Sequence, residues 1–248
     1  MRPRLQCAGL RLRRGNSVVV DGVDADFHAG SLAAVVGPNG GGKSTLLAAL
    51  AGHLAPAGGL LTQDGKPPRP SPAVAYLPQG RHQIQDVPVT ILDVVRLGRH
   101  AQVGPWRGFK TVDHAAVAAA VNAMGLDEVQ TQAFRASSGG QQQRTLIARA
   151  LATGAEILIL DEPLAGLDEP TSEDLLIRLR AWSQPPRLTV AVIHDLGAVR
   201  RHCTHALLLN RRQIAWGETA AVMTHHHLDA CFLGAVLHGA HKTQTATP

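Results

Sequence analysis

A phosphate-binding pattern, G-x-x-x-x-G-K-[ST], occurs as Gly37-Pro38-Asn39-Gly40-Gly41-Gly42-Lys43-Ser44-Thr45. The apolar run Leu32–Val36 before it predicts a buried strand, and residues 46–51 after it predict a helix. Glycines allow backbone N–H groups to converge on phosphate oxygens, and a helix N-terminus directs its positive dipole end at the same anion. Lys43 is therefore expected to reach the β- and γ-phosphates of ATP, and Ser44 to bind Mg²⁺ through its hydroxyl.

The composition of the 248-residue chain limits its class. It is 45% hydrophobic and 3% aromatic, which is enough apolar material for one sizeable core or two subdomains filled by Ala, Leu and Val. The net charge of +5 suits a surface near anionic lipid or nucleic acid but establishes neither.

Cys7, Cys203 and Cys231 are far apart, which favours a reducing compartment over a disulfide framework. The sequence has no run of the ~20 apolar residues that a membrane helix requires and no expected signal peptide, so work at a membrane would need a partner.

Apolar runs and turn residues predict an α/β fold with a mostly parallel sheet and an antiparallel β part within residues 1–31. Strands are expected at residues 10–13, 17–20, 32–36, 60–64, 74–77, 157–160 and 188–193, with a hairpin of 206–209 and 213–216. Strand signals are absent from residues 83–143, where the helical spacing in 91–97 and 114–124 predicts an inserted α-helical subdomain. Further helices are expected at residues 142–151 and 171–182.

Three predicted strands end in residues that suit nucleotide chemistry, namely Gln79, Asp161-Glu162 and His194. Ligands of a parallel α/β sheet bind beyond the carboxyl ends of its strands. We therefore expect these residues to meet beside the phosphate loop. Taken singly, each has a simpler explanation, because a carboxylate at a strand end can cap a helix and a histidine can be a satisfied core group.

ATP hydrolysis depends on positioned charge and a positioned water molecule more than on covalent help from the protein. Glu162 is the candidate general base for that water, and Asp161 is the candidate Mg²⁺ ligand, acting through water. Gln79 can bind Mg²⁺ with its carbonyl oxygen and sense the γ-phosphate. His194 is expected to hydrogen-bond the γ-phosphate and the region of Glu162.

The order and approximate spacing of these motifs resemble those of the ATP-binding-cassette (ABC) transporter ATPases, a family of P-loop NTPases. The resemblance rests on residues 37–45, Gln79, Ser138-Gly139-Gly140-Gln141, residues 157–163, residues 165–168 and His194. It implies a head-to-tail homodimer around two ATP molecules, in which Ser138, Gly139, Gly140 and Gln141 bind the γ-phosphate held by the other subunit. It also implies that Asp168 communicates across that interface.

The resemblance covers roughly residues 5–233 and implies a single ABC ATPase domain over residues 1–233. Its core would comprise residues 1–82 and 144–233, with the helical subdomain at about 83–143. Residues 234–248 are expected to form a flexible tail.

Several stretches are similar to the importer ATPases for manganese, zinc and chelated iron in particular: residues 76–79, 87–95, 98–99, 140–144, 207–212 and 216–217. That similarity implies an integral membrane permease, with a contact near Gly80–Thr90, and a metal-binding solute-binding protein that acts indirectly. It implies no nucleic-acid partner. The expected location is peripheral, on the cytoplasmic face of the inner (plasma) membrane.

Two other functions stay open. The first is an ATPase subunit of an ABC importer whose cargo is cobalamin or an iron–siderophore. The other is a non-transport ABC ATPase of the iron–sulfur assembly type. DNA-repair relatives insert a long coiled coil that the segment between Gln79 and Ser138 is too short to hold, and translation-type relatives carry two cassettes where this chain has one.

The chain departs from the family pattern at four places. Arg14 stands near the position of a tyrosine that usually stacks on adenine, and a guanidinium can also stack on a base. Ser137 replaces a leucine before the Ser138 motif, which puts helix packing there in question. Gly41 replaces an alanine, which predicts a looser phosphate loop. Ile193 takes the place of a histidine that often precedes His194.

Two groups of histidines invite interpretation as zinc sites, His202 with His205 and the run His225-His226-His227. The first pair brackets the start of an apolar strand, so its side chains are expected to point to different faces. The second has no nearby carboxylate or thiol cluster at ligand spacing. Solvated or capping histidines are the favoured interpretation of both.

Overall fold

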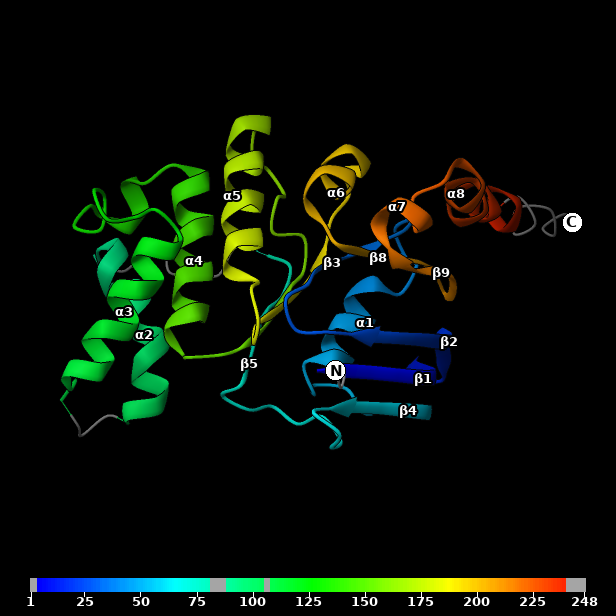
Figure 1. Ribbon diagram of the computed structural model, residues 1–248, viewed down its shortest axis with the longest axis horizontal. Helices are drawn as coiled ribbons and strands as arrows, with labels where there is room; N and C mark the ends of the chain where they lie inside the picture. The colour runs from blue at the N-terminus through cyan, green and yellow to red at the C-terminus, as the bar shows by residue number, and fades with distance from the viewer. Residues whose placement is uncertain (1–3, 81–87, 105–107, 240–248) are drawn as a thin grey trace, which may run out of the picture.

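Residues 4–80, 88–104 and 108–239 are described by a computed structural model of the chain (Figure 1). Its strands are β1 (Leu5–Arg14), β2 (Ser17–Phe27), β3 (Leu32–Val36), β4 (Gly58–Gln63), β5 (Val74–Leu77), β6 (Ile157–Leu160), β7 (Leu188–Val192), β8 (His205–Asn210) and β9 (Arg212–Glu218). Its helices are α1 (Lys43–Leu50), α2 (Ile91–Val103), α3 (Thr111–Ala123), a 3₁₀ turn (Phe134–Ala136), α4 (Gly139–Ala152), α5 (Glu169–Trp182), α6 (Leu196–His202), α7 (Thr219–Val222) and α8 (His225–Gly239).

Two sheets organise the fold. The larger has the order β5-β6-β7-β3-β8-β9, in which β9 alone runs antiparallel to its neighbour, and the smaller has the antiparallel order β2-β1-β4. Helices α2, α3 and α4 form a separate group at one end of the molecule in Figure 1. The predicted α/β architecture, with an N-terminal antiparallel part and an inserted helical subdomain, is confirmed.

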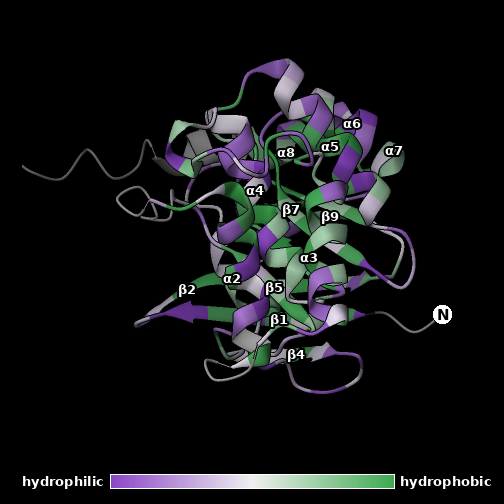
Figure 2. Cartoon of the chain, turned by 90° about the vertical axis from the view of Figure 1, so that its left-hand side faces the viewer, coloured by the Kyte–Doolittle hydropathy of each residue, from purple (hydrophilic) through white to green (hydrophobic). Residues whose placement is uncertain are grey.

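The inner strands β3, β6 and β7 of the larger sheet are buried along their whole length, which explains why they read as continuous apolar runs. Alternate residues of β3 enter two different hydrophobic clusters: Leu32 and Val36 pack among helices α2–α6, whereas Ala33 and Val35 pack against α1 and the smaller sheet. Figure 2 shows the strands β5 and β7 in hydrophobic green, while α5 and α6 on the outside carry hydrophilic purple. The period-two alternation of a strand thus joins the two cores through one sheet.

Side-chain caps set the starts of the helices that matter most for the site. Ser138 and Gln141 form a reciprocal capping box at the start of α4, with Ser138 N donating to Gln141 Oε1 at 2.9 Å and Gln141 N to Ser138 Oγ at 3.2 Å. Asp168 caps α5 by accepting from Thr171 N at 3.0 Å. Both helices therefore begin where the sequence places its motif residues.

Several boundaries differ from the sequence prediction. Strand β2 continues to Phe27, well past the predicted end at residue 20, because Val23, Ala25 and Phe27 alternate into the core between exposed or half-buried neighbours. Helix α6 was not predicted. Helix α8 continues to Gly239, past the predicted start of the flexible tail at residue 234, and residues 240–248 lie outside the described part of the chain.

Helices α2 and α4 pack closely at Gly98, where a Cβ would lie 1.9 Å from the carbonyl oxygen of Arg149. We expect Gly98→Ala to lower the free energy of unfolding by about 1–3 kcal/mol, because overpacking against backbone outweighs the roughly 1 kcal/mol that alanine gains in helix propensity. The midpoint of urea denaturation measures this. Gly108→Ala is the control, since its Cβ would meet no described residue within 4 Å. An unchanged midpoint for Gly98→Ala would contradict the close packing.

Candidate functional site

The phosphate-binding pattern forms the predicted strand–loop–helix unit between β3 and α1. Gly42 has φ 95° directly before α1, a left-handed conformation that glycine adopts without a Cβ penalty. Lys43 is buried, and its Nζ donates to the carbonyl oxygens of Gly37 at 2.8 Å and Pro38 at 2.9 Å. Burial lowers the pKa of Lys43, while the nearby carboxylates of Glu162 and Asp161 act to raise it. The Lys43 ammonium group is therefore held by carbonyl oxygens of the same loop.

The end of β8 and the turn that follows it pack against the phosphate loop. A Cβ at Gly37 would lie 1.9 Å from the carbonyl oxygen of Leu209, and one at Gly41 would lie 2.9 Å from the carbonyl oxygens of Leu209 and Pro38. Arg211 N also donates to Gly41 O at 2.8 Å. Gly41 therefore leaves room for this close approach of the two backbones, and its effect on the looseness of the loop stays a prediction.

The sheet order brings the four predicted strand ends together. Strands β5, β6, β7 and β3 are consecutive neighbours, so Gln79, Glu162, His194 and the phosphate loop lie along one edge. Gln79 Nε2 donates to Glu162 Oε2 at 2.6 Å, and His194 Nε2 lies 2.9 Å from Glu162 Oε1. Glu162 thus has one neighbour on each carboxylate oxygen.

Glu162 has an unusual backbone. Its φ is +54°, in the left-handed region that residues with a Cβ seldom occupy. This conformation comes directly after the buried strand β6 and Asp161. Non-glycine residues in such conformations concentrate at functional sites.

Asp161 is buried beside the loop, and burial raises the pKa of its carboxyl group. A side-chain hydrogen bond from Ser44 acts in the opposite direction. Within the described residues, Asp161 Oδ1 is buried without a hydrogen-bond partner. A buried carboxylate oxygen without a partner, next to a hydroxyl, is a donor set that fits a hard divalent cation.

A cavity of about 710 Å³ lies over the loop. It is lined by residues 39–45, Arg14, Val19, Gln79, Glu162 and His194. Arg14 therefore borders the same space as the phosphate loop. Val19 also lines the cavity and was not singled out from the sequence, although its place in the strand after the Gly15-Asn16 turn was predicted.

The stretch Ser138–Gln141 lies apart from this cavity. Among the described residues that line the space over the loop, none comes from this stretch. Gly139 instead borders a second cavity, of about 370 Å³, together with Gln79 and Glu162. Ser137, where a leucine was expected, is buried and donates to Ala133 O at 3.2 Å, so the helix start packs normally.

The remaining candidates have structural partners. Asp168 is the α5 cap, and hydrogen bonds from Thr171 lower the pKa of its carboxyl group. His202 Nε2 pairs with Glu173, and the ring of His205 stacks on Trp216 with centroids 5.6 Å apart. His225–His227 form the first turn of α8. In the described part of the chain no group of three or more His, Cys, Asp or Glu is arranged to hold a metal ion.

Two further sequence predictions concern the membrane. Of the predicted permease contact, residues 81–87 lie outside the described residues, whereas Gly80 and Pro88–Thr90 lie inside them. Among the helices described, none is both long and apolar enough to cross a bilayer.

Comparison with known proteins gives the family. The ABC transporter family profile matches residues 20–165. The manganese transport system ATP-binding protein MntB of Bacillus subtilis is 33% identical over 217 residues, covering 87% of each chain. The zinc transport system ATP-binding protein TroB of Treponema pallidum is 32% identical over 94% of this chain and 88% of its own. The hemin import ATP-binding protein HmuV of Streptomyces coelicolor is 38% identical over 84% and 75%.

Solved structures agree with this relationship. A chain from a transporter described as metal-chelate type, in an inward-facing conformation, superposes with a TM-score of 0.79 at 28% identity, covering 92% of this chain and 88% of that one. The cbiO1 chain of Clostridium perfringens has a TM-score of 0.80 at 22% identity, covering 97% and 100%, which shows the shared fold. The chain with the phosphate loop at Gly37–Thr45 therefore belongs to the ABC transporter family, as an ATP-binding subunit.

Proposed function

We propose that this chain is the ATP-hydrolysing subunit of an ABC importer for a transition-metal ion, zinc or manganese, with chelated iron as a further candidate. The observation that carries the ATPase part is the placement of Glu162 between Gln79 and His194, at the rim of the cavity over the phosphate loop. The metal cargo rests on the manganese, zinc and chelated-iron relatives.

In the proposed mechanism Glu162 accepts a proton from the attacking water, and the hydrogen bonds of Gln79 and His194 orient its carboxylate. Lys43 leaves the carbonyl oxygens of Gly37 and Pro38 to pair with the β- and γ-phosphates, where its charge stabilises the transferred phosphoryl group. His194, whose side chain is half exposed, can turn from Glu162 to the γ-phosphate.

Mg²⁺ fits the donor set at the end of β6. Ser44 would offer a hydroxyl, Gln79 a carbonyl oxygen, and Asp161 the carboxylate oxygen that has no partner among the described residues. The ion would neutralise phosphate charge when bound with ATP. Arg14 lines the same cavity, and its guanidinium would stack on the adenine ring.

Residues 138–141 are proposed to complete the site from a second copy of the chain. In one chain they do not line the cavity over the loop, while the N-terminus of α4 carries backbone N–H groups, and Ser138 a hydroxyl proton, that can bind an anion. We therefore propose a head-to-tail homodimer in the ATP-bound state, with Asp168 near its interface. A permease would contact the segment Gly80–Thr90, at the cytoplasmic face of the inner membrane, with a solute-binding protein acting on the far side.

The test uses the native host. Affinity purification of the tagged chain from detergent-solubilised membranes should recover a multispanning permease, and a deletion strain should lose uptake of radiolabelled zinc or manganese. Growth on limiting zinc against limiting manganese would identify the metal. Recovery of only non-membrane partners would contradict the importer and favour the iron–sulfur assembly type. Retained metal uptake with lost cobalamin or siderophore uptake would leave the ATPase assignment intact and change the cargo.

A further inference from the structure

The first turn of α4 packs against the first turn of α5 at Gly140 and Thr171. A Cβ on Gly140 would lie 2.3 Å from Cγ2 of Thr171, so these two residues touch without an intervening side chain. Gly140 follows the α4 cap Ser138 by two residues, and Thr171 is the residue whose N–H Asp168 accepts. The capping residues Ser138 and Asp168 therefore lie close in sequence to the contact between Gly140 and Thr171.

A second contact lies one turn further along both helices. Arg144 Nη1 donates to Asp174 Oδ2 at 3.2 Å, and Arg178 Nε donates to both carboxylate oxygens of Asp174, at 3.0 and 2.9 Å. Gly140 and Arg144 on α4 thus face Thr171 and Asp174 on α5 in the same order. This order shows that the two helices run in the same direction along their contact.

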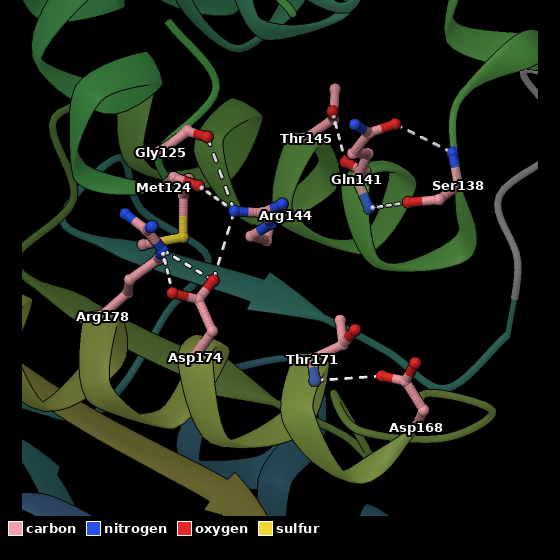
Figure 3. A network of polar contacts seen from close by, with 10 residues as sticks. All are labelled: Met124, Gly125, Ser138, Gln141, Arg144, Thr145, Asp168, Thr171, Asp174 and Arg178. Atoms are coloured by element: carbon pink, nitrogen blue, oxygen red, sulfur yellow. Dashed lines mark hydrogen bonds and ion pairs between the residues drawn. The ribbon is translucent and has the colours of Figure 1, made fainter. Parts of the chain in front are cut away.

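Arg144 also reaches the helical subdomain. The same Nη1 lies 3.3 Å from Met124 O and 3.5 Å from Gly125 O, at the C-terminal end of α3. Gly125 has φ +60°, and a Cβ there would lie 2.3 Å from the guanidinium of Arg178. The Arg144–Asp174–Arg178 cluster therefore joins α3, α4 and α5 at one point, as Figure 3 shows.

We propose that Arg144 and Asp174 are positioning residues, which keep Ser138 and Asp168 in fixed relation so that both reach the partner subunit together. This inference rests on the proposed function, because it assumes that residues 138–141 act across a dimer. Charge-assisted hydrogen bonds between partly buried groups are strong and directional, and a small misplacement of phosphate donors is costly to catalysis. The cluster touches neither the phosphate loop nor the cavity above it, so ATP binding to the chain's own loop does not depend on it.

The chain contains a matched control. Arg4 pairs with Asp64 at the start of β1, far from the site, with side-chain exposures of 15% and 47% against 17% and 42% for Arg144 and Asp174. Asp174→Asn and Asp64→Asn each remove one charge from a comparable pair. Asp174→Glu retains the carboxylate and serves as the conservative variant. If the Asp174 pair were only structural, the two Asn variants would behave alike.

The experiment measures steady-state ATP hydrolysis of the full chain, melting temperature, and ATP-dependent dimerisation by light scattering in a Glu162→Gln background. We expect Asp174→Asn to lower kcat ~10-fold and to raise the protein concentration needed for dimers ~10-fold, the factor that corresponds to losing one such hydrogen bond. Binding of a fluorescent ATP analogue to the monomer should change less than ~2-fold, and Asp174→Glu should recover most of kcat.

Equal kcat and equal dimerisation for Asp174→Asn and Asp64→Asn would overturn the inference, whatever their melting temperatures. Weaker binding of the analogue to the Asp174→Asn monomer would also overturn it, because the effect would then lie at the chain's own loop. Failure of the unaltered chain to hydrolyse ATP or to dimerise would instead contradict the proposed function, so the two failures are distinguishable.

Discussion

Glu162→Gln is expected to bind ATP, to form stable dimers and to hydrolyse ATP ~10²–10⁴-fold more slowly than the unaltered chain, a loss of about 3–5 kcal/mol of barrier reduction. A glutamine has the shape of the glutamate and keeps an oxygen that can accept from Gln79 Nε2, so the geometry at the rim should persist. Its amide cannot take a proton from water. Phosphate release and light scattering in the presence of ATP measure the two halves of this prediction.

Glu128→Gln is the control for this experiment, because Glu128 is an exposed carboxylate of the helical subdomain that does not line either cavity at the site. It should leave both turnover and dimerisation unchanged. Turnover of Glu162→Gln within a few-fold of the unaltered chain would remove Glu162 from the role of base. The flanking His194 would then be the next group to replace.

Lys43→Ala should abolish most ATP binding. The variant removes the cation that is proposed to pair with the β- and γ-phosphates of ATP. Since a hydrogen bond to a charged group contributes about 1.5–3 kcal/mol, we expect the affinity for ATP to fall ~10–100-fold and hydrolysis to fall at least as far. Equilibrium binding of a fluorescent ATP analogue tests the affinity directly.

The exposed Lys66, in the turn after β4, supplies a control of the same residue type. Lys66→Ala should bind the analogue normally and keep its melting temperature. A Lys43→Ala variant that binds as tightly as Lys66→Ala would show that the backbone N–H groups of the loop hold the phosphates without the lysine.

Much of this architecture could be read from local sequence. The bounds of β3, β5 and β6 were predicted to the residue, because strands buried on both faces are continuous apolar runs that stop at polar or breaking residues. The convergence of Gln79, Glu162 and His194 was also predicted, since the ends of parallel strands share one edge. These inferences needed only the order of the elements.

Contacts between distant segments could not be read in the same way. The support that Leu209 and Arg211 give to Gly37 and Gly41 depends on β8 lying next to β3, which no local pattern encodes. The left-handed backbone of Glu162 was also missed, because no residue pattern in the sequence signals a positive φ at a glutamate. Periodicity shows which side of a residue is buried, but it cannot identify the neighbour on that side.

The backbone at Glu162 has a consequence for anyone who engineers this chain. A residue with a Cβ at φ +54° costs about 1–3 kcal/mol, and glycine or asparagine would remove much of that cost. A library screened only for heat resistance would therefore favour substitutions of Glu162 that abolish turnover. Thermal stability is thus a poor criterion for choosing the residue at this position. Position 162 is therefore a useful marker of retained activity when variants of this chain are sorted by stability alone.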